Sequence, residues 1–343
     1  MASQSGRRST VRDIAKETGL SIATISRVLN GHAHVAPHTR DTVQRAIARL
    51  GTQAARPRRA NATEAEPAAV FVRCPYPLTD YFGLILSSIA ETLQLHGRHA
   101  ILDAGQLAQS EAVLPTLPTR PGIGGAILIL PPEPSDQLIA LRDRGLPFVV
   151  VDPRTRPPRD IPAVSAAHFA GANAMTMHLL GLGHRRIGVL AGPHNWLAGQ
   201  ARLAGHHAAL AGAGITADPT LVRTAEPTAQ FGYHATLELL DLPRPPTAIV
   251  GFNDKAAVGA LTAAAERGLR VPADLSVTGF DDIDLAQATS PRLTTVRQPL
   301  QEMGRMAVSL LIRLLARHQV DALHIELATD LIIRESTGPA PNQ

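Results

Sequence analysis

The sequence predicts a small all-α head followed by an α/β body of two lobes built on parallel sheets. Three observations lead to this fold class. Helical apolar patterns fill much of residues 1–51, strand-like apolar runs alternate with helical stretches from residue 68 onward, and this alternation occurs twice in series. A chain of 343 residues is also long enough for more than one core. We therefore expect a head at 1–51, a linker at 52–67 and a body at 68–338.

The charge of the chain is concentrated in the head. Residues 1–60 carry 11 basic and 3 acidic side chains, an excess of 8, whereas the whole chain has a formal net charge of +4. The rest of the chain therefore has a net charge of −4. A basic segment on a mildly acidic body indicates that the head meets a polyanion. A solvated basic tail is the alternative, but the helical pattern of the head favours nucleic acid.

The head reads as three short helices. Thr10 and Asp13 form a Thr-x-x-Asp helix start, and Gly19 supplies the left-handed geometry that ends a helix abruptly. Ser21 caps a second helix, and Pro37 suits the first turn of a third. The apolar or small residues of the inward faces are Val11, Ile14, Ala15 and Thr18, then Ile25, Val28 and Leu29, then Val43, Ala46, Ile47 and Leu50. This pattern predicts a helix-turn-helix unit, although such a trio of helices need not touch DNA.

The stretch TVRDIAKETGLSIATISRVLNG, residues 10–31, resembles the head of the LacI/GalR family of bacterial transcription regulators. The resemblance implies that the helix from Ser21 to Leu29 enters the major groove of operator DNA. It places Ser21, at the start of this helix, among the DNA-binding residues, Ile22, Ala23 and Arg27 at base edges, and Thr24, Ser26, Asn30, His34 and Thr39 near phosphates. Ile22 or Ala23 can pack on a thymine methyl group. Arg27 can donate hydrogen bonds to the edge of a guanine base, with a phosphate contact as the alternative.

The linker departs from the family pattern. Thr52 stands where the family usually has tyrosine, and no leucine or other large apolar residue follows before Val70. The family's minor-groove wedge is therefore missing, and the DNA bending that such wedges cause should be weaker. The linker instead carries Arg56, Arg58 and Arg59, which suit a narrow minor groove. The alternative is a plain flexible tether.

The body alternates strands and helices in chain order. The first set of predicted elements is AAVFV at 68–72, a helix near 83–96, HAILD at 99–103, GAILIL at 125–130, a helix at 135–144 and PFVVVD at 147–152. The second set is a helix near 171–180, RIGVLAG at 186–192, a helix near 201–211, AIVGF at 248–252, a helix from 254 and LSVTGF at 275–280. A further helix is expected at 299–315. Each set predicts one lobe, with a cleft between them.

Nearly the whole body resembles the sensor domain of the same family, which is similar to periplasmic sugar-binding proteins. The resemblance rests on GHRRI at 183–187, RLAG at 202–205, GFDD at 279–282 and LTTVRQP at 293–299. It implies effector contacts from Asp152, Arg202, Asn253 and Asp281. Tyr81, Phe82 and Trp196 are candidate rings for packing on a sugar, with core packing as the alternative, favoured for Phe82.

Two departures from the family pattern leave the identity of the effector open. The chain has Ala167 and His168 where the family often has Asp-Asn, and Pro227 where some sugar sensors carry an aromatic residue. Arg202 is equally able to bind a carboxylate or phosphate group of a ligand. The alternative for Asp281 is a structural ion pair with Arg202.

Other function classes have less support. The single cysteine, Cys74, has no basic, helix-capped setting, and the histidine pairs lack partners at metal spacing, so we expect no enzyme activity, cofactor or metal. The first ten residues have no apolar core of a signal peptide and no apolar run spans a bilayer, so we expect a cytoplasmic protein without membrane segments. A sugar-binding solute receptor fits the body but not the basic head.

The combined interpretation is a homodimeric transcription regulator, most often a repressor in this family. Its affinity for a double-stranded DNA operator would be controlled by a small-molecule effector, with a sugar as the first expectation. We expect the dimer surface to include the first body helix and the helix at 299–315.

Overall fold

The computed structural model describes residues 11–21, 24–25, 28, 36–49, 68–109, 112–318 and 323–341. The chain divides into two compact units, residues 1–66 and 67–343, which are described separately below. Among the described residues, no helix is both long and apolar enough to cross a membrane.

The first unit holds the predicted helical head. Helix α1 spans Val11–Thr18 and α3 spans Pro37–Arg49, and between them residues 24, 25 and 28 are helical. Gly19 has φ of +68° just after α1, as its predicted role in ending that helix requires. The Ser21 hydroxyl accepts a hydrogen bond from the Thr24 backbone N–H at 3.1 Å, so Ser21 caps the second helix as predicted. Ile25, Val43 and Ala46 are buried together and form the small core.

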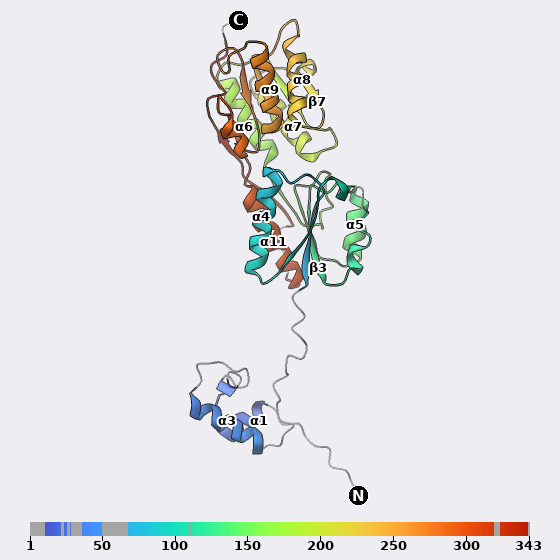
Figure 1. Ribbon diagram of the computed structural model, residues 1–343, viewed down its shortest axis with the longest axis vertical. Helices are drawn as coiled ribbons and strands as arrows, with labels where there is room; N and C mark the ends of the chain where they lie inside the picture. Colours follow the sequence, from blue (N-terminus) through green and yellow to red (C-terminus); the bar gives the residue numbers. More distant parts are fainter. Residues whose placement is uncertain are drawn as a thin grey trace. The chain divides into compact units, whose positions relative to one another are not determined.

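The second unit begins with a lobe built on a six-stranded parallel sheet, here called the N-lobe. Its strand order is β11-β5-β4-β3-β1-β2. The strands are β1 (Ala69–Cys74), β2 (Ala100–Ala104), β3 (Ile123–Ile129), β4 (Phe148–Val151), β5 (Ala163–Ala166) and β11 (His324–Leu327). Helices α4 (Asp80–Leu95) and α11 (Leu300–Leu315) cover one face and α5 (Ser135–Asp143) covers the other (Figure 1). Successive residues of β1, such as Val70 and Phe71, enter opposite cores because side chains alternate along a strand.

The other lobe, here called the C-lobe, has a four-stranded parallel sheet in the order β7-β6-β8-β9. Its strands are β6 (Ile187–Ala191), β7 (Val222–Thr224), β8 (Ala248–Gly251) and β9 (Ser276–Thr278). Helices α8 (Ala229–Leu240) and α9 (Asp254–Glu266) pack on one face, and α6 (His168–Gly181) and α7 (Leu197–Gly212) pack on the other. Short helices complete the body: η1 (Gln106–Gln109), η2 (Leu117–Thr119), η3 (Pro219–Leu221) and α10 (Asp284–Ala288).

Three segments connect the two lobes. The chain crosses between β5 and α6, between β10 (Thr295–Arg297) and α11, and between β11 and β12 (Asp330–Ile332). Strands β10 and β12 pair antiparallel beside the C-lobe helix α6. The predicted α/β body of two lobes with parallel sheets is therefore confirmed, and its lobes share a triple connection.

Three helices begin earlier than the sequence predicts. Helix α4 starts at Asp80 rather than Gly83, α6 at His168 rather than Gly171, and α7 at Leu197 rather than Ala201. The residues before them, Thr79, Ala167 and Trp196, make no side-chain capping hydrogen bond, so no capping signal marks these starts. The earlier starts matter because they put Tyr81, Phe82, His168 and Trp196 in or beside first turns of helices.

Candidate functional site

Three of the predicted DNA-contacting residues lie within the described part of the head. Ser21 is exposed, and its hydroxyl lies 2.8 Å from the Thr24 hydroxyl. Thr39 is half-buried on α3 and lies 3.2 Å from Nε2 of His38. The other nine predicted positions lie outside the described residues: Ile22, Ala23, Ser26, Arg27, Asn30, His34, Arg56, Arg58 and Arg59. Contacts to bases and phosphates therefore stay a prediction.

A cleft between the two lobes of the body forms a cavity of about 630 Å³. This volume lies within the range of small-molecule sites. Seven residues that the sequence singles out all line it: Tyr81, Phe82, Asp152, Trp196, Arg202, Asn253 and Asp281. They come from both lobes and gather where strands end and helices begin, which is the usual ligand position in α/β folds. The structure thus brings the set together, and contact with an effector stays a prediction.

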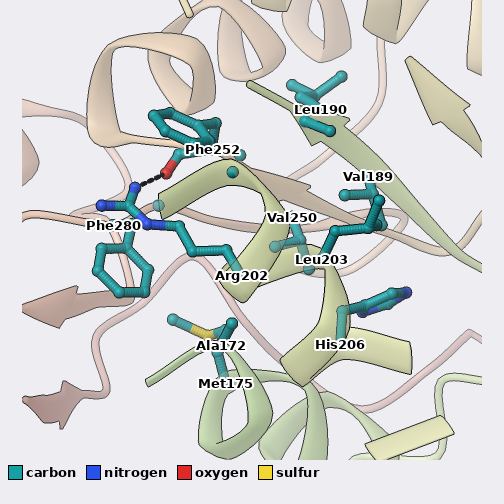
Figure 2. Close-up of a pocket in the computed structure, with 14 residues that line it drawn as sticks. Ala172, Met175, Val189, Leu190, Arg202, Leu203, His206, Val250, Phe252 and Phe280 are labelled. Atoms are coloured by element: carbon teal, nitrogen blue, oxygen red, sulfur yellow. Dashed lines mark hydrogen bonds between the residues drawn. The ribbon is translucent and has the colours of Figure 1, made fainter. Parts of the chain in front are cut away.

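Arg202, on α7, lies between two aromatic rings. Its guanidinium carbon is 4.3 Å from the centre of the Phe252 ring and 3.7 Å from that of Phe280, and Nη1 donates to the Phe252 carbonyl oxygen (Figure 2). Burial lowers the pKa of Arg202, against the opposing effect of the nearby carboxylates of Asp281 and Asp152. Because both faces of the guanidinium are covered, Arg202 can offer a ligand only its edge.

A second, much smaller cavity lies behind Arg202, among Ala172, Met175, His206 and neighbouring side chains (Figure 2). Its volume is about 30 Å³, enough for one water molecule and too small for a metabolite. The large cleft is therefore the candidate ligand site.

His168 connects Arg202 to Asp152 across the first crossover between the lobes. Nε and Nη2 of Arg202 lie 3.4 and 3.3 Å from Nδ1 of His168, and Nε2 of His168 lies 2.6 Å from Oδ1 of Asp152. Arg202 has no acceptor, so Nδ1 must accept and the ring proton must be on Nε2, which donates to Asp152. The Tyr81 hydroxyl donates to the other oxygen of Asp152 at 2.8 Å.

These hydrogen bonds shape the titration of Asp152. Burial acts to raise its pKa, but the electrostatic effect and the hydrogen bond of His168, the hydrogen bond from Tyr81 and the charge of Arg202 together outweigh burial, so the pKa is lowered. The pKa of Tyr81 is raised well above its usual value by burial and by the neighbouring Asp152 carboxylate. The floor of the cleft therefore holds an ionised carboxylate that accepts hydrogen bonds, beside a neutral phenol that donates.

Asp281 follows β9 and is the second carboxylate near Arg202. Its Oδ1 accepts a hydrogen bond from Nε2 of Gln298 at 2.6 Å and lies 3.8 Å from Nη2 of Arg202. Burial raises the pKa of Asp281 to about 6, although Arg202 and Gln298 act to lower it. Asp281 and Asp152 both have positive φ, +119° and +49°, a strained conformation that recurs at functional sites.

The remaining predicted residues have defined but different settings. The Asn253 side-chain oxygen caps α9 by accepting from the Ala256 N–H at 2.9 Å, which leaves its amide N–H groups for a ligand. Phe82 is half-buried and stacks on Tyr76 at 5.1 Å, so it lines the cleft and also packs on the N-lobe core. Trp196 is 9 % exposed and packs edge-on against Phe252.

Sequence reasoning missed the roles of several residues in and around the cleft. His168, which contacts the lining residues Asp152 and Arg202, stood out only as a departure from the family pattern. Arg154, Tyr76 and Lys255 line the cavity itself. Each lies within three residues of the end of β1, β4 or β8 or the start of α9, and that position was the only available signal.

Two other kinds of site have little support in the structure. Cys74 is buried, and burial raises the pKa of its thiol to about 12, which is unsuited to a thiolate nucleophile. Within the described ranges, no group of three or more His, Cys, Asp or Glu side chains is arranged to hold a metal ion.

The chain matches known proteins along almost its whole length. Residues 10–52 match the family described as "Bacterial regulatory proteins, lacI family", and residues 176–337 match the "Periplasmic binding protein-like domain". The HTH-type transcriptional repressor CytR of Escherichia coli strain K12 is 34% identical over 333 residues, which cover 97% of each chain.

Solved structures agree with this similarity. The complex of the transcriptional regulator CelR with cellobiose is 30% identical, with a TM-score of 0.73, over 96% of this chain and 100% of that one. The lac repressor dimer bound to operator and the anti-inducer ONPF is 28% identical, with a TM-score of 0.70, over 97% of this chain and 100% of that one. The chain therefore belongs to the LacI family of bacterial regulatory proteins, with a helix-turn-helix head and a periplasmic-binding-like body.

Proposed function

We propose that this chain is a dimeric transcription regulator in which residues 1–51 bind operator DNA, 52–67 form the linker and 68–338 bind a small-molecule effector. The cleft carries the proposal, because all seven residues singled out from the sequence line one cavity between the lobes. The operator-bound lac repressor dimer and the cellobiose-bound CelR support both halves of it. A repressor is the first expectation, since CytR is one.

The chemistry of the cleft favours an effector rich in hydroxyl groups, such as a sugar. The carboxylates of Asp152 and Asp281 accept hydrogen bonds from hydroxyls, whereas Arg202 and the Asn253 amide donate. The Trp196 and Phe82 rings offer apolar faces for the C–H groups of a sugar ring. This balance of donors, acceptors and rings is typical of a binding site, and we propose a binding role without catalysis.

Control of DNA binding would follow from linkage between the cleft and the head. An effector that contacts both lobes stabilises one arrangement of the lobes over others. In a dimer, that arrangement sets the spacing of the two heads and so their affinity for a two-fold operator. Binding to chromosomal DNA requires a cytoplasmic location, which we also propose.

A thermal-shift screen of sugars and related metabolites tests the effector site. A stabilising ligand should lose its effect in Asp281→Ala and in Arg202→Ala, and keep it in the control Arg185→Ala, which changes an exposed arginine away from the cleft. A ligand whose effect survives both cleft substitutions would show that the site lies elsewhere.

Salt dependence separates a regulator from a solute receptor. A regulator that neutralises several phosphates should lose roughly a thousandfold or more in DNA affinity between 50 and 200 mM salt, because bound counterions are released. We expect this loss for duplex DNA that carries the operator, measured by fluorescence anisotropy. A protein that binds no duplex DNA at low salt would favour the receptor.

A further inference from the structure

The cleft holds two cationic side chains that lie beyond ion-pair distance of every acidic side chain in the described part of the chain, although the charge of one of them, Lys255, acts on Asp281. Arg202 is not one of them, because it already contacts His168, the Phe252 carbonyl and Asp281. Arg154 and Lys255 line the same cavity, from the N-lobe and the C-lobe respectively, and neither forms an ion pair within the described part of the chain. Among the described residues, Glu226 is the one acidic lining residue besides Asp152 and Asp281, and its side chain is exposed.

The setting of Arg154 leaves most of its donors unused. Its guanidinium carbon lies 4.8 Å from the centre of the Trp196 ring, and Nη1 donates to the Tyr76 hydroxyl at 3.2 Å. That hydroxyl in turn donates to the Leu130 carbonyl oxygen at 2.8 Å. Arg154 is therefore held in place by a ring and a phenol, with several N–H groups left to donate into the cavity.

Trp196 supplies an independent observation. Its indole N–H is buried and has no hydrogen-bond acceptor among the described residues, although the side chain lines the cleft. A buried donor without an acceptor is unfavourable, so a group that enters this corner and accepts a hydrogen bond would remove the penalty. Arg154 beside Trp196 can only donate, so it does not supply the missing acceptor.

We propose that the effector carries an anionic group, a carboxylate or a phosphate, which binds Arg154 and the Trp196 N–H, with Lys255 as a second cation from the other lobe. The inference rests on the proposed effector site and specifies the ligand class as an acidic sugar or a sugar phosphate. The hydroxyl groups of that ligand would face Asp152 and Asp281. Recognition of an acidic group would thus come from Arg154, and not from Arg202 as the sequence alone suggests.

The fluorescence of Trp196 gives a direct readout of anion binding in the cleft, because Trp196 is the only tryptophan in the chain. In the full-length protein at constant ionic strength, inorganic phosphate or acetate should change Trp196 emission saturably, and chloride should not. Arg154→Gln should weaken this response about tenfold or more, the usual effect of losing one charge-assisted hydrogen bond. The matched control is Arg120→Gln, which removes an arginine that also lies over a ring, that of Phe71, away from the cleft.

A set of matched ligands shows whether the site prefers a carboxylate or a phosphate. A variant of Trp196 tests whether its indole N–H is the second donor. Glucose, glucuronate and glucose 6-phosphate are compared in thermal shift, and at least one acidic form should stabilise the protein more than glucose. Trp196→Phe keeps the ring but removes the N–H, and should reduce the preference for the acidic form. Operator binding by each variant checks that it is folded.

Three results would overturn the inference: no saturable response to either anion, an unchanged response in Arg154→Gln, or a neutral effector whose affinity does not depend on Arg154. The third result would leave the proposed effector site intact. Failure of the proposed function has a different signature, namely that no ligand of the cleft alters operator affinity.

Discussion

His168 fixes the directions of the hydrogen bonds on the floor of the cleft. It accepts from Arg202 through Nδ1 and donates to Asp152 through Nε2. Replacing it with a ring that can do neither would leave two buried charged groups each short of a partner. We expect His168→Phe to lower the free energy of unfolding by about 2–4 kcal/mol and to weaken effector binding.

The comparison that tests this role is His168→Asn. The asparagine side-chain oxygen can accept from Arg202 where Nδ1 does, so this variant should recover part of the lost stability and affinity. Urea unfolding and effector titration measure the two quantities. If Asn were no better than Phe, the hydrogen bond to Arg202 would have no role in holding the site.

The raised pKa of Asp281 predicts that the stability of the folded protein depends on pH. Its pKa in the folded protein is about 6, raised by burial above the usual value of 3.8. The folded state therefore holds this proton more tightly than the unfolded state. Its contribution to stability is full below pH 3.8 and is lost as pH rises through about 6.

Asp281→Asn imitates the protonated acid at every pH. Relative to this variant, the wild-type protein should lose up to about 3 kcal/mol of unfolding free energy between pH 4 and pH 7. Urea unfolding at a series of pH values checks the sign and the midpoint. A difference between the two proteins that stays flat over this range would contradict the raised pKa.

At the scale of elements, glycines set how closely the C-lobe helices approach. A Cβ added to Gly259 of α9 would lie 2.0 Å from the Ala229 carbonyl oxygen of α8, and one added to Gly232 of α8 would lie 2.0 Å from the Ala256 carbonyl oxygen of α9. Such contacts are with backbone, which cannot rotate away. The two helices must therefore separate if either glycine is replaced.

Gly259→Ala should cost about 2–3 kcal/mol of unfolding free energy through overpacking. The matched control is Gly181→Ala, at the end of α6, where nothing lies within 4 Å of the new Cβ. The control should be neutral or gain up to about 1 kcal/mol from helix propensity. Thermal and urea unfolding of both variants give the comparison, and equal stabilities would rule out close packing as the reason for glycine.

The elements also show what the sequence could and could not predict. Asp152, Asn253 and Asp281 directly follow or closely follow parallel strands, so their convergence at one sheet edge was predictable from the pattern. The stacking of Arg202 between Phe252 and Phe280 depends on segments some 50 or more positions away, and no local pattern encodes it. Strand β11 was missed because it is short, at the sheet edge and partly polar.

At the scale of the whole molecule, the N-lobe leaves apolar side chains exposed around one sheet edge. Strand β2 is the edge strand, with Ile101 and Leu102 exposed, and Leu95 at the end of α4 is 86% exposed. An open strand edge beside exposed leucines is typical of a surface that another chain covers. Helix α11 differs, since its apolar residues face inward and its exposed positions are polar.

The dimer contact of the N-lobe is therefore expected along α4 and β2, and not along α11. Leu95→Lys combined with Leu102→Lys should shift the protein towards monomers in sedimentation velocity and weaken operator binding, because a monomer holds only one half-site. The matched control adds the same charge on the exposed side of α11, as Gln301→Lys with Ser309→Lys, and should leave the dimer intact. The reverse outcome would place the contact on α11. Since neither pair of substitutions touches the cleft, effector affinity in the first pair should persist even where operator control is lost, which separates ligand recognition from its transmission to DNA.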